Sequence, residues 1–249
     1  MNIRFIGTFA WYYGVKIFSR GPSYVIASLA TPLSLLFIVY ILTAGKILDF
    51  AVVGGVISLV GSIGLQSAGD ATFMKLQLRV QEMYVASDVS PIDYMLALTM
   101  SFLTFSIPGI VVYVILGVSL GLYSLFTIAV MIFLLVLLTL STSAIAFIIS
   151  GLVKHVRNVW GIVGILAIIM TVIPPTFYPY TYLNNSSSLL IYVLSISPVT
   201  PAAVIAQTLF GLPGIPFNAW MLEFSFSVLI LETVVFFAIA KYLIRWREN

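Results

Sequence analysis

Two long stretches of this chain contain no charged side chain. One covers the 60 residues from Tyr94 to Val153, and the other covers the 65 residues from Asn158 to Leu222. About 20 consecutive apolar residues are enough to cross the roughly 30 Å hydrocarbon core of a bilayer, where only helices and closed barrels satisfy their own backbone. The two stretches therefore predict a polytopic membrane protein with helical spans.

The composition supports the same class. Hydrophobic residues make up 61% of the chain and charged residues only 8%, whereas about a quarter of the residues in an ordinary globular protein are charged. The length of 249 residues leaves room for about six spans with short connections, and little room for a soluble domain. We therefore predict one all-α transmembrane domain, residues 1–249. Because there is no cysteine, disulfides and thiolate metal sites are excluded.

Charged and turn-forming residues mark the ends of the spans. Arg20 and Lys46 bracket the first uncharged block, and Asp49 and Asp70 bracket the second. The third block is too long for one crossing, and its glycine-containing segment 117–124 divides it into two. The predicted spans lie near residues 22–44, 50–69, 93–117, 125–150, 159–174 and 219–243.

The cationic residues predict the orientation. Six spans place both termini on one side, and all Lys and Arg residues except Lys46 then lie on that side. Since Lys and Arg next to spans accumulate on the cytoplasmic face, we expect a multi-pass protein of the cell membrane with both termini in the cytoplasm. The residues on that face are Arg4, Lys16, Arg20, Lys75, Arg79, Lys154, Arg157, Lys241, Arg245 and Arg247.

Residues 1–20 have the periodicity of an amphipathic helix. Ile3, Ile6, Ala10, Tyr13 and Ile17 recur on one arc at helical spacing. We interpret the segment as an interfacial helix that lies on the cytoplasmic membrane surface. A frayed tail with accidental periodicity is the alternative.

The predicted cytoplasmic connection, residues 71–92, is the most polar part of the chain. Arg79 and Glu82 stand three residues apart, as neighbours on a helix face do. Ser90 is a candidate N-cap, followed by Pro91 at the first helical position and Asp93 in the first turn. We therefore expect the second span to extend into the cytoplasm, turn at a short polar helix and re-enter the membrane at Pro91; the alternative is a solvated loop.

The predicted extracellular connection, residues 175–217, contains no charge. Its apolar segments are too short to span a bilayer, so re-entrant or interfacial helices between spans five and six are expected. Asn184 and Asn185 both fit the N-x-Ser acceptor pattern, which makes them possible glycosylation sites.

Catalytic constellations are absent from the sequence. There is no GxxxxGK[ST] loop, and the single histidine, His155, sits between Lys154 and Arg157 in a predicted loop. We therefore expect neither a catalytic site nor a metal site in this chain. Glu232 is the one acid near the middle of a predicted span, which suggests either a functional carboxyl group or a neutral, hydrogen-bonded packing residue.

Several segments, taken in order, resemble the permeases of type-2 ABC exporters. They are Arg20-Gly21-Pro22-Ser23-Tyr24, Thr31-Pro32, Val89-Ser90-Pro91-Ile92, Phe177-Tyr178-Pro179 and Ser197-Pro198-Val199-Thr200-Pro201. The resemblance covers nearly the whole chain. It implies a permease that pairs with a second, identical or homologous permease and with two separate ATPase subunits that bind ATP and Mg²⁺. Such a complex moves drugs, lipids or lipid-linked glycans outward.

The resemblance also implies site residues. The ATPase-coupling element would include Arg79, Glu82, Met83, Tyr84 and Asp88, although this turn is less densely charged than is usual in the family. Spans two and five would line the substrate pathway between subunits. The pathway candidates are Gly61, Ser62, Leu65, Gln66, Ile165, Ile169 and Met170.

Two other functions fit the sequence. An ion-coupled secondary transporter or channel would use Glu232 as its coupling acid. A structural membrane anchor is the third hypothesis. A neighbouring gene that encodes a soluble P-loop protein would favour the exporter.

Overall fold

The computed structural model describes residues 2–16, 21–79, 83–84, 86–87 and 89–243, and in this part of the chain all regular structure is helical. The elements are α1 (Ile3–Ala10), the π-helical turn η1 (Trp11–Val15), α3 (Pro22–Thr43), α4 (Leu48–Leu76), α6 (Pro91–Ser119), α7 (Leu125–Leu152), α8 (Val156–Thr171), α9 (Thr181–Ser186), α10 (Ser188–Leu194), α11 (Val199–Leu209) and α12 (Ala219–Leu243).

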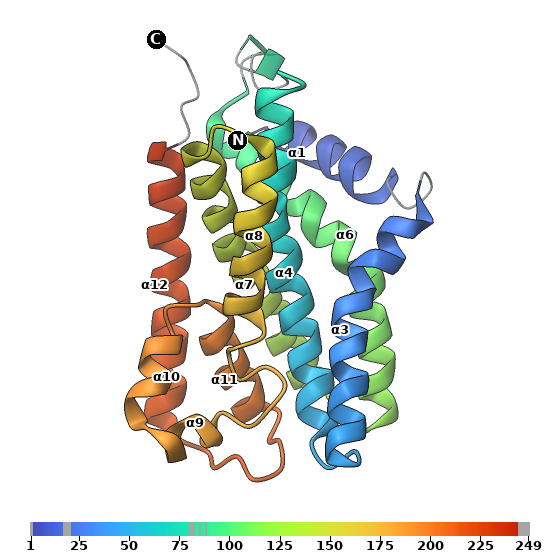
Figure 1. Cartoon of the computed structure of the whole chain (residues 1–249), viewed down its shortest axis with the longest axis vertical. Helices are drawn as coiled ribbons and strands as arrows, with labels where there is room; N and C mark the ends of the chain where they lie inside the picture. Colours follow the sequence, from blue (N-terminus) through green and yellow to red (C-terminus); the bar gives the residue numbers. More distant parts are fainter. Residues whose placement is uncertain (1, 17–20, 80–82, 85, 88, 244–249) are drawn as a thin grey trace.

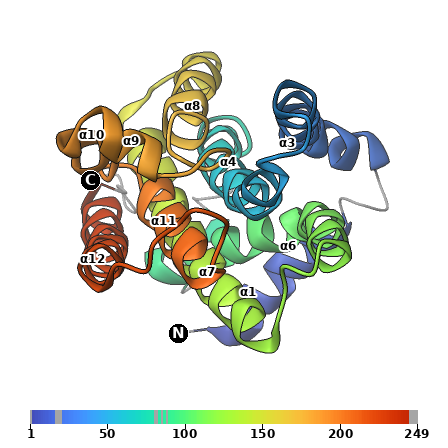
Figure 2. The same ribbon diagram turned by 90° about the horizontal axis from the view of Figure 1, so that it is seen from below.

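The long helices form one bundle. α3, α4, α6, α7, α8 and α12 run along its long axis, and the two ends of the chain lie at the same end of the bundle, the upper end in Figure 1. α1 runs across that upper end, whereas α9 and α10 lie at the lower end and α11 lies inside the bundle's lower half. Seen from below, α4 stands between α3, α6 and α8 (Figure 2).

Four helices among the described residues are long and apolar enough to cross a membrane: α4, α6, α7 and α12. The chain is therefore a multi-pass membrane protein. α8 has 16 residues, so at about 1.5 Å per residue it is some 24 Å long, shorter than the roughly 30 Å hydrocarbon core.

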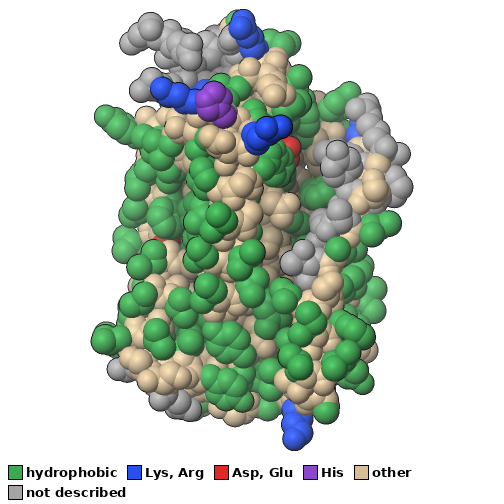
Figure 3. Space-filling model, viewed as in Figure 1, with side chains coloured by type: hydrophobic (Ala, Val, Ile, Leu, Met, Phe, Trp, Pro, Cys, Tyr) green, Lys and Arg blue, Asp and Glu red, His purple; other side chains and the backbone are tan. Residues whose placement is uncertain are grey.

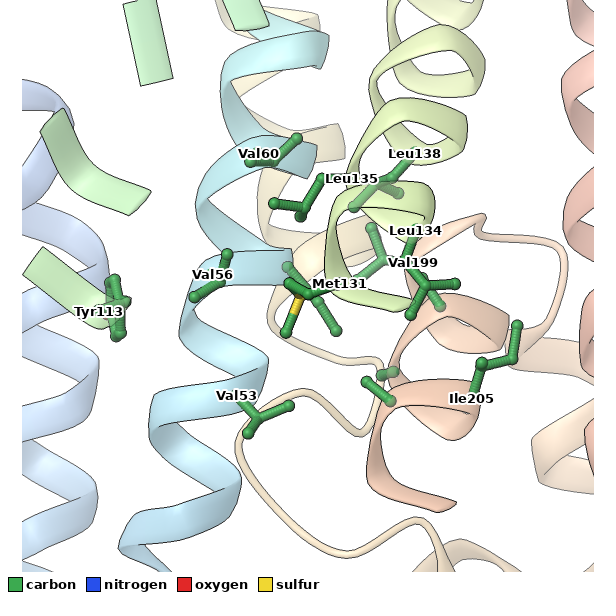
Figure 4. Close-up of a cluster of buried hydrophobic side chains, with 14 of the residues drawn as sticks. Val53, Val56, Val60, Tyr113, Met131, Leu134, Leu135, Leu138, Val199 and Ile205 are labelled. Atoms are coloured by element: carbon green, nitrogen blue, oxygen red, sulfur yellow. The ribbon is translucent and has the colours of Figure 1, made fainter. Parts of the chain in front are cut away.

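The largest hydrophobic cluster joins α4, α7 and α11. Val56 and Val60 of α4 meet Met131 and Leu138 of α7, with Val199 of α11 beside them (Figure 4). α4 is the central helix, because it contacts α3, α6, α7, α8 and α11. Burial on several sides explains why α4 is apolar almost all round instead of amphipathic.

Two helix starts agree with the sequence. Ser90 caps α6, its hydroxyl accepting a hydrogen bond from the Asp93 backbone N–H at 3.1 Å, and Pro91 is the first helical residue. The predicted break at 117–124 is a turn between α6 and α7. Ser124 and Thr127 form a reciprocal capping box that starts α7. The predicted helix start at Ser90-Pro91 and the predicted break at 117–124 are confirmed.

The second span, predicted near residues 50–69 and expected to extend beyond the membrane as a helix, is α4, which continues through Leu76. The end of the fifth span differs from the expected one. α8 begins at Val156 and ends at Thr171, before Pro174. Proline restricts the residue before it away from helical dihedrals, and the chain has already left the helix when the Pro174-Pro175 pair begins.

α1 packs against α6. Phe9 and Gly14 are buried against α6, and Ile6 and Tyr13 pack with them, whereas Ile3 is 70% exposed. Of the four described residues of the predicted apolar arc, Ile6, Ala10 and Tyr13 are therefore partly buried, and Ile3 is exposed. Aromatic packing against α6 decides which side of the helix is buried, and Ile17 lies outside the described residues.

The cations lie mainly at one end of the bundle. Figure 3 shows the Lys and Arg side chains near the upper end, with one group at the lower end. The α3–α4 turn at the lower end carries Lys46. The described cations on segments at the upper end are Arg4, Lys16, Lys75, Arg79, Lys154, Arg157 and Lys241.

Candidate functional site

One stripe of partly or fully exposed residues runs along α4, whose other residues from Phe50 to Met74 are buried. From Phe50 to Leu76 every residue is buried except Ser62, Gln66, Asp70, Phe73, Lys75 and Leu76. Ser62, Gln66, Asp70 and Phe73 follow one another at intervals of four, four and three residues, so they share one face of the helix. We call these four residues the α4 stripe. It runs from within the bundle toward the upper end, where α4 leads into the connection to α6.

α8 packs along one side of this stripe. The Ser62 hydroxyl lies 3.4 Å from the Thr171 hydroxyl of α8, and it also donates to the Ser58 carbonyl oxygen at 2.6 Å. Nearer the upper end, Trp160 of α8 packs on Gly69, where an added Cβ would come within 2.4 Å of the indole ring. The two helices are thus in contact at both ends of the stripe.

The pathway candidates occupy two different environments. Gly61 and Leu65 are buried inside the chain: Gly61 faces Val199 and Thr171, and Leu65 belongs to a cluster with Val159 and Val163 of α8. Neither residue reaches a surface of the chain, because helices α7, α8 and α11 enclose that side of α4.

The other candidates lie at or near the surface. Gln66 is exposed, and its side chain makes no hydrogen bond to the described part of the chain. On α8, Ile165 is 63% exposed and Ile169 is 47% exposed, whereas Met170 is partly buried. Asp70 and Thr171 were not among the candidates. The four-residue spacing of Asp70 from Gln66 was the signal that could have identified it.

The connection between α4 and α6 is attached to the bundle by an aromatic cluster. The Tyr84 ring lies 5.1 Å from Phe5, 6.1 Å from Phe9 and 5.7 Å from Tyr94, measured between ring centroids. Burial, with a smaller contribution from the Tyr13 phenol, raises the pKa of Tyr84 above its usual value. Tyr84 is therefore a neutral packing residue that joins the connection to α1 and α6.

The remaining coupling candidates are more exposed or lie outside the described residues. Met83 is 67% exposed beside the half-buried Tyr84. Arg79 is exposed, lies beyond the end of α4 and has a positive φ of 50°. Glu82 and Asp88 lie outside the described residues.

The uncharged segment after α8 folds back around one amide. Gln207 of α11, 2% exposed, donates hydrogen bonds to the carbonyl oxygens of Pro175 and Tyr178. Its own oxygen accepts from the Tyr180 N–H at 2.9 Å. Buried backbone polar groups need hydrogen-bond partners, and Gln207 supplies them to this non-helical segment. Asn184 and Asn185 lie in the short helix α9, at the lower end.

Glu232 lies midway along α12, on the side that packs against α7. It is 9% exposed, and its Oε2 has no hydrogen-bond partner in the described part of the chain. The helices that pack against α12 include α7, α11 and α10, and none of these three contains a charged residue. If Glu232 were a neutral, hydrogen-bonded packing residue, a hydrogen-bond partner would be expected at its carboxyl group. Among the described residues, Oε2 has none.

Among the described residues, no three His, Asp or Glu side chains gather into a group that could hold a metal ion. No protein-family profile matches this chain, and no curated protein matches it.

Proposed function

We propose that this chain is the membrane-spanning permease subunit of an ATP-driven exporter of the ABC class, with six spans and both termini in the cytoplasm. In this proposal two permease subunits, identical or homologous, form an outward pathway for amphipathic drugs, lipids or lipid-linked molecules. Separate ATPase subunits bind ATP and Mg²⁺ and supply the work.

The α4 stripe is the observation that carries this proposal. On the most enclosed helix of the bundle, Gln66 is exposed and Ser62 and Asp70 are partly exposed. Polar groups at membrane depth are costly when they face lipid, so they normally face a water-filled cavity or another protein chain. A pathway between two copies, with the exposed Ile165 and Ile169 providing apolar surface, would satisfy both the polar stripe and an amphipathic substrate.

The same helix supports the coupling part of the proposal. α4 leads from the stripe directly into the connection that holds Arg79, Met83 and Tyr84, and Tyr84 is packed against α1 and α6. A push on this connection would therefore reach α4, α6 and α1 together. Such a contact could bias the bundle between inward-open and outward-open states.

Capture of the tagged chain from its native membrane, followed by mass analysis of the bound proteins, tests this function. We expect a soluble protein with a GxxxxGK[ST] loop in stoichiometric amount. Met83→Glu should reduce its capture, because Met83 is exposed on the proposed docking connection. Leu152→Glu is the matched control, since Leu152 is 64% exposed at the same end but outside that connection. Capture of no such ATPase would contradict the exporter.

Glu232 supports a second candidate, an ion-coupled secondary transporter or channel. A buried carboxyl group with an unpartnered oxygen suits reversible proton or cation binding. The two functions predict different results for Glu232→Gln in proteoliposomes. The exporter should keep ATP-driven transport at every external pH, whereas an ion-coupled transporter should lose transport and its dependence on pH.

A further inference from the structure

One face of α1 and η1 is turned away from the bundle and carries a regular set of side chains. Arg4, Thr8, Tyr12 and Lys16 recur at every fourth residue, and all four are exposed. Trp11, 58% exposed, lies beside them. We call these five residues the α1 outer face.

The opposite face is fixed to α6, so the helix cannot roll. Phe9 is 4% exposed, and its carbonyl oxygen accepts a hydrogen bond from the Ser101 hydroxyl of α6 at 3.5 Å. An added Cβ at Gly14 would come within 2.9 Å of both the Ser101 carbonyl oxygen and the Thr104 side chain. This close approach determines which residues are left for the outer face.

The π-helical turn keeps the cations together. The Lys16 N–H donates to the Trp11 carbonyl oxygen, a bond that spans five residues instead of four. A π-helical turn contains more residues than an α-helical turn, so each residue turns the side-chain direction by a smaller angle. Lys16 therefore points to the same side as Arg4, while Tyr13 and Gly14 face α6. The Lys16 ammonium nitrogen also lies 5.1 Å from the centroid of the Tyr12 ring, which orients it along the same face.

The charged side chains of residues 2–16 are all cationic. Residues 2–16 contain two cations and no acid. Asp93, which accepts a hydrogen bond from the Asn2 backbone N–H at 3.0 Å, is only 5% exposed and is therefore covered. The segment lies at the periphery of the bundle, at the end where most cations gather (Figures 1, 2 and 3).

We propose that the α1 outer face binds the phosphate headgroups of anionic phospholipids. Arg4 and Lys16 would contact the phosphates, and Trp11 and Tyr12 would sit at headgroup level, where aromatic rings with one polar edge are most stable. A cation near an anionic membrane surface strengthens binding by about fivefold, so the two together should contribute roughly 30-fold. This site is independent of whatever the bundle transports.

Lipid competition on the purified full-length chain tests the proposal. The chain in detergent is mixed with equal amounts of phosphatidylglycerol and phosphatidylcholine, and the bound lipids are counted by native mass spectrometry. The unmodified chain should prefer phosphatidylglycerol. Arg4→Gln with Lys16→Gln should reduce this preference by at least tenfold. The matched control, Lys154→Gln with Arg157→Gln, removes two exposed cations from the same end and should keep it.

Two results would overturn the proposal. One is an unchanged preference in the Arg4 and Lys16 variant, and the other is an equal loss in the control variant, which would indicate only a general effect of net charge. If the double variant does not fold, salt provides a second test on the unmodified chain. Raising NaCl from about 0.05 to about 0.5 M should weaken the preference, because these exposed charges are screened. A preference that survives high salt, or an acidic protein captured through these residues with no lipid preference, also overturns it.

Discussion

At the residue scale, single glycines set how closely α4 approaches its neighbours. An added Cβ at Gly54 would come within 1.5 Å of the Thr176 carbonyl oxygen, and one at Gly64 within 2.0 Å of the Thr142 hydroxyl. Gly161 and Gly164 on α8 differ, because an added Cβ would meet nothing within 4 Å. A larger residue would therefore clash at positions 54 and 64 but would fit at positions 161 and 164.

Gly54→Ala should destabilise the chain strongly. Its neighbour is backbone rather than a flexible side chain, so α4 and the segment after α8 must separate, at a cost of about 2 kcal/mol or more. Gly161→Ala should be neutral or stabilising by up to about 1 kcal/mol, since alanine is the better helix former. Thermal unfolding of both variants in detergent measures the difference. Equal unfolding temperatures would contradict the close contact at Gly54.

Gln66→Leu should separate stability from transport. The Gln66 side chain is exposed and makes no hydrogen bond to the described residues, so its loss should change the free energy of unfolding by no more than about 0.5 kcal/mol. If the α4 stripe lines a pathway, however, transport of an amphipathic dye should fall. Gly161→Ala, on the neighbouring helix, serves as a folded control. Normal dye transport in Gln66→Leu would remove the stripe from the pathway.

At the element scale, α8 and the segment after it act as one unit. α8 is short, and the chain continues through Pro174 and Pro175 in a non-helical, buried conformation. The Thr176 hydroxyl donates to the Thr171 carbonyl oxygen at 2.9 Å, and the Ser197 hydroxyl donates to the Met170 carbonyl oxygen at 2.8 Å. These side chains satisfy carbonyl groups that the end of a helix leaves without partners.

Gln207→Leu tests whether the amide holds this unit. The substitution removes the partners of the Pro175 and Tyr178 carbonyl oxygens and of the Tyr180 N–H. Leaving buried backbone groups unpaired costs about 1–3 kcal/mol each, so the unfolding temperature should fall well below that of Gln66→Leu, which makes the same chemical change on the surface. A similar unfolding temperature for the two variants would show that water replaces the amide.

At the scale of the whole molecule, the positions of the cations and of the connections both distinguish the two ends of the bundle. Lys46 is in the α3–α4 turn at the lower end, and the other described cations lie on segments at the upper end (Figures 1 and 3). The α4–α6 connection and the segment that contains α9 and α10 lie at opposite ends of the bundle. In a membrane these two connections are expected on opposite sides.

Cysteine labelling tests the orientation directly. Ser87→Cys and Ser187→Cys each place one thiol in a chain without cysteine, and both positions are exposed. On intact cells a membrane-impermeant thiol reagent should label the variant at position 187 and not the one at position 87. After the membrane is permeabilised, both should react. Labelling at position 87 alone on intact cells would reverse the orientation.

The sequence by itself determined the features that depend on local chemistry. The charge-free stretches identify a helical membrane protein, Ser90 with Pro91 marks the start of α6, and the glycine-containing segment 117–124 marks the break before α7. Capping and hydropathy act over a few residues, so they can be recognised along the chain. The tertiary structure alone decided which faces are buried. Gly61 and Leu65 are enclosed while Gln66 is exposed, and Tyr13 faces α6, because these outcomes depend on which distant helices pack together.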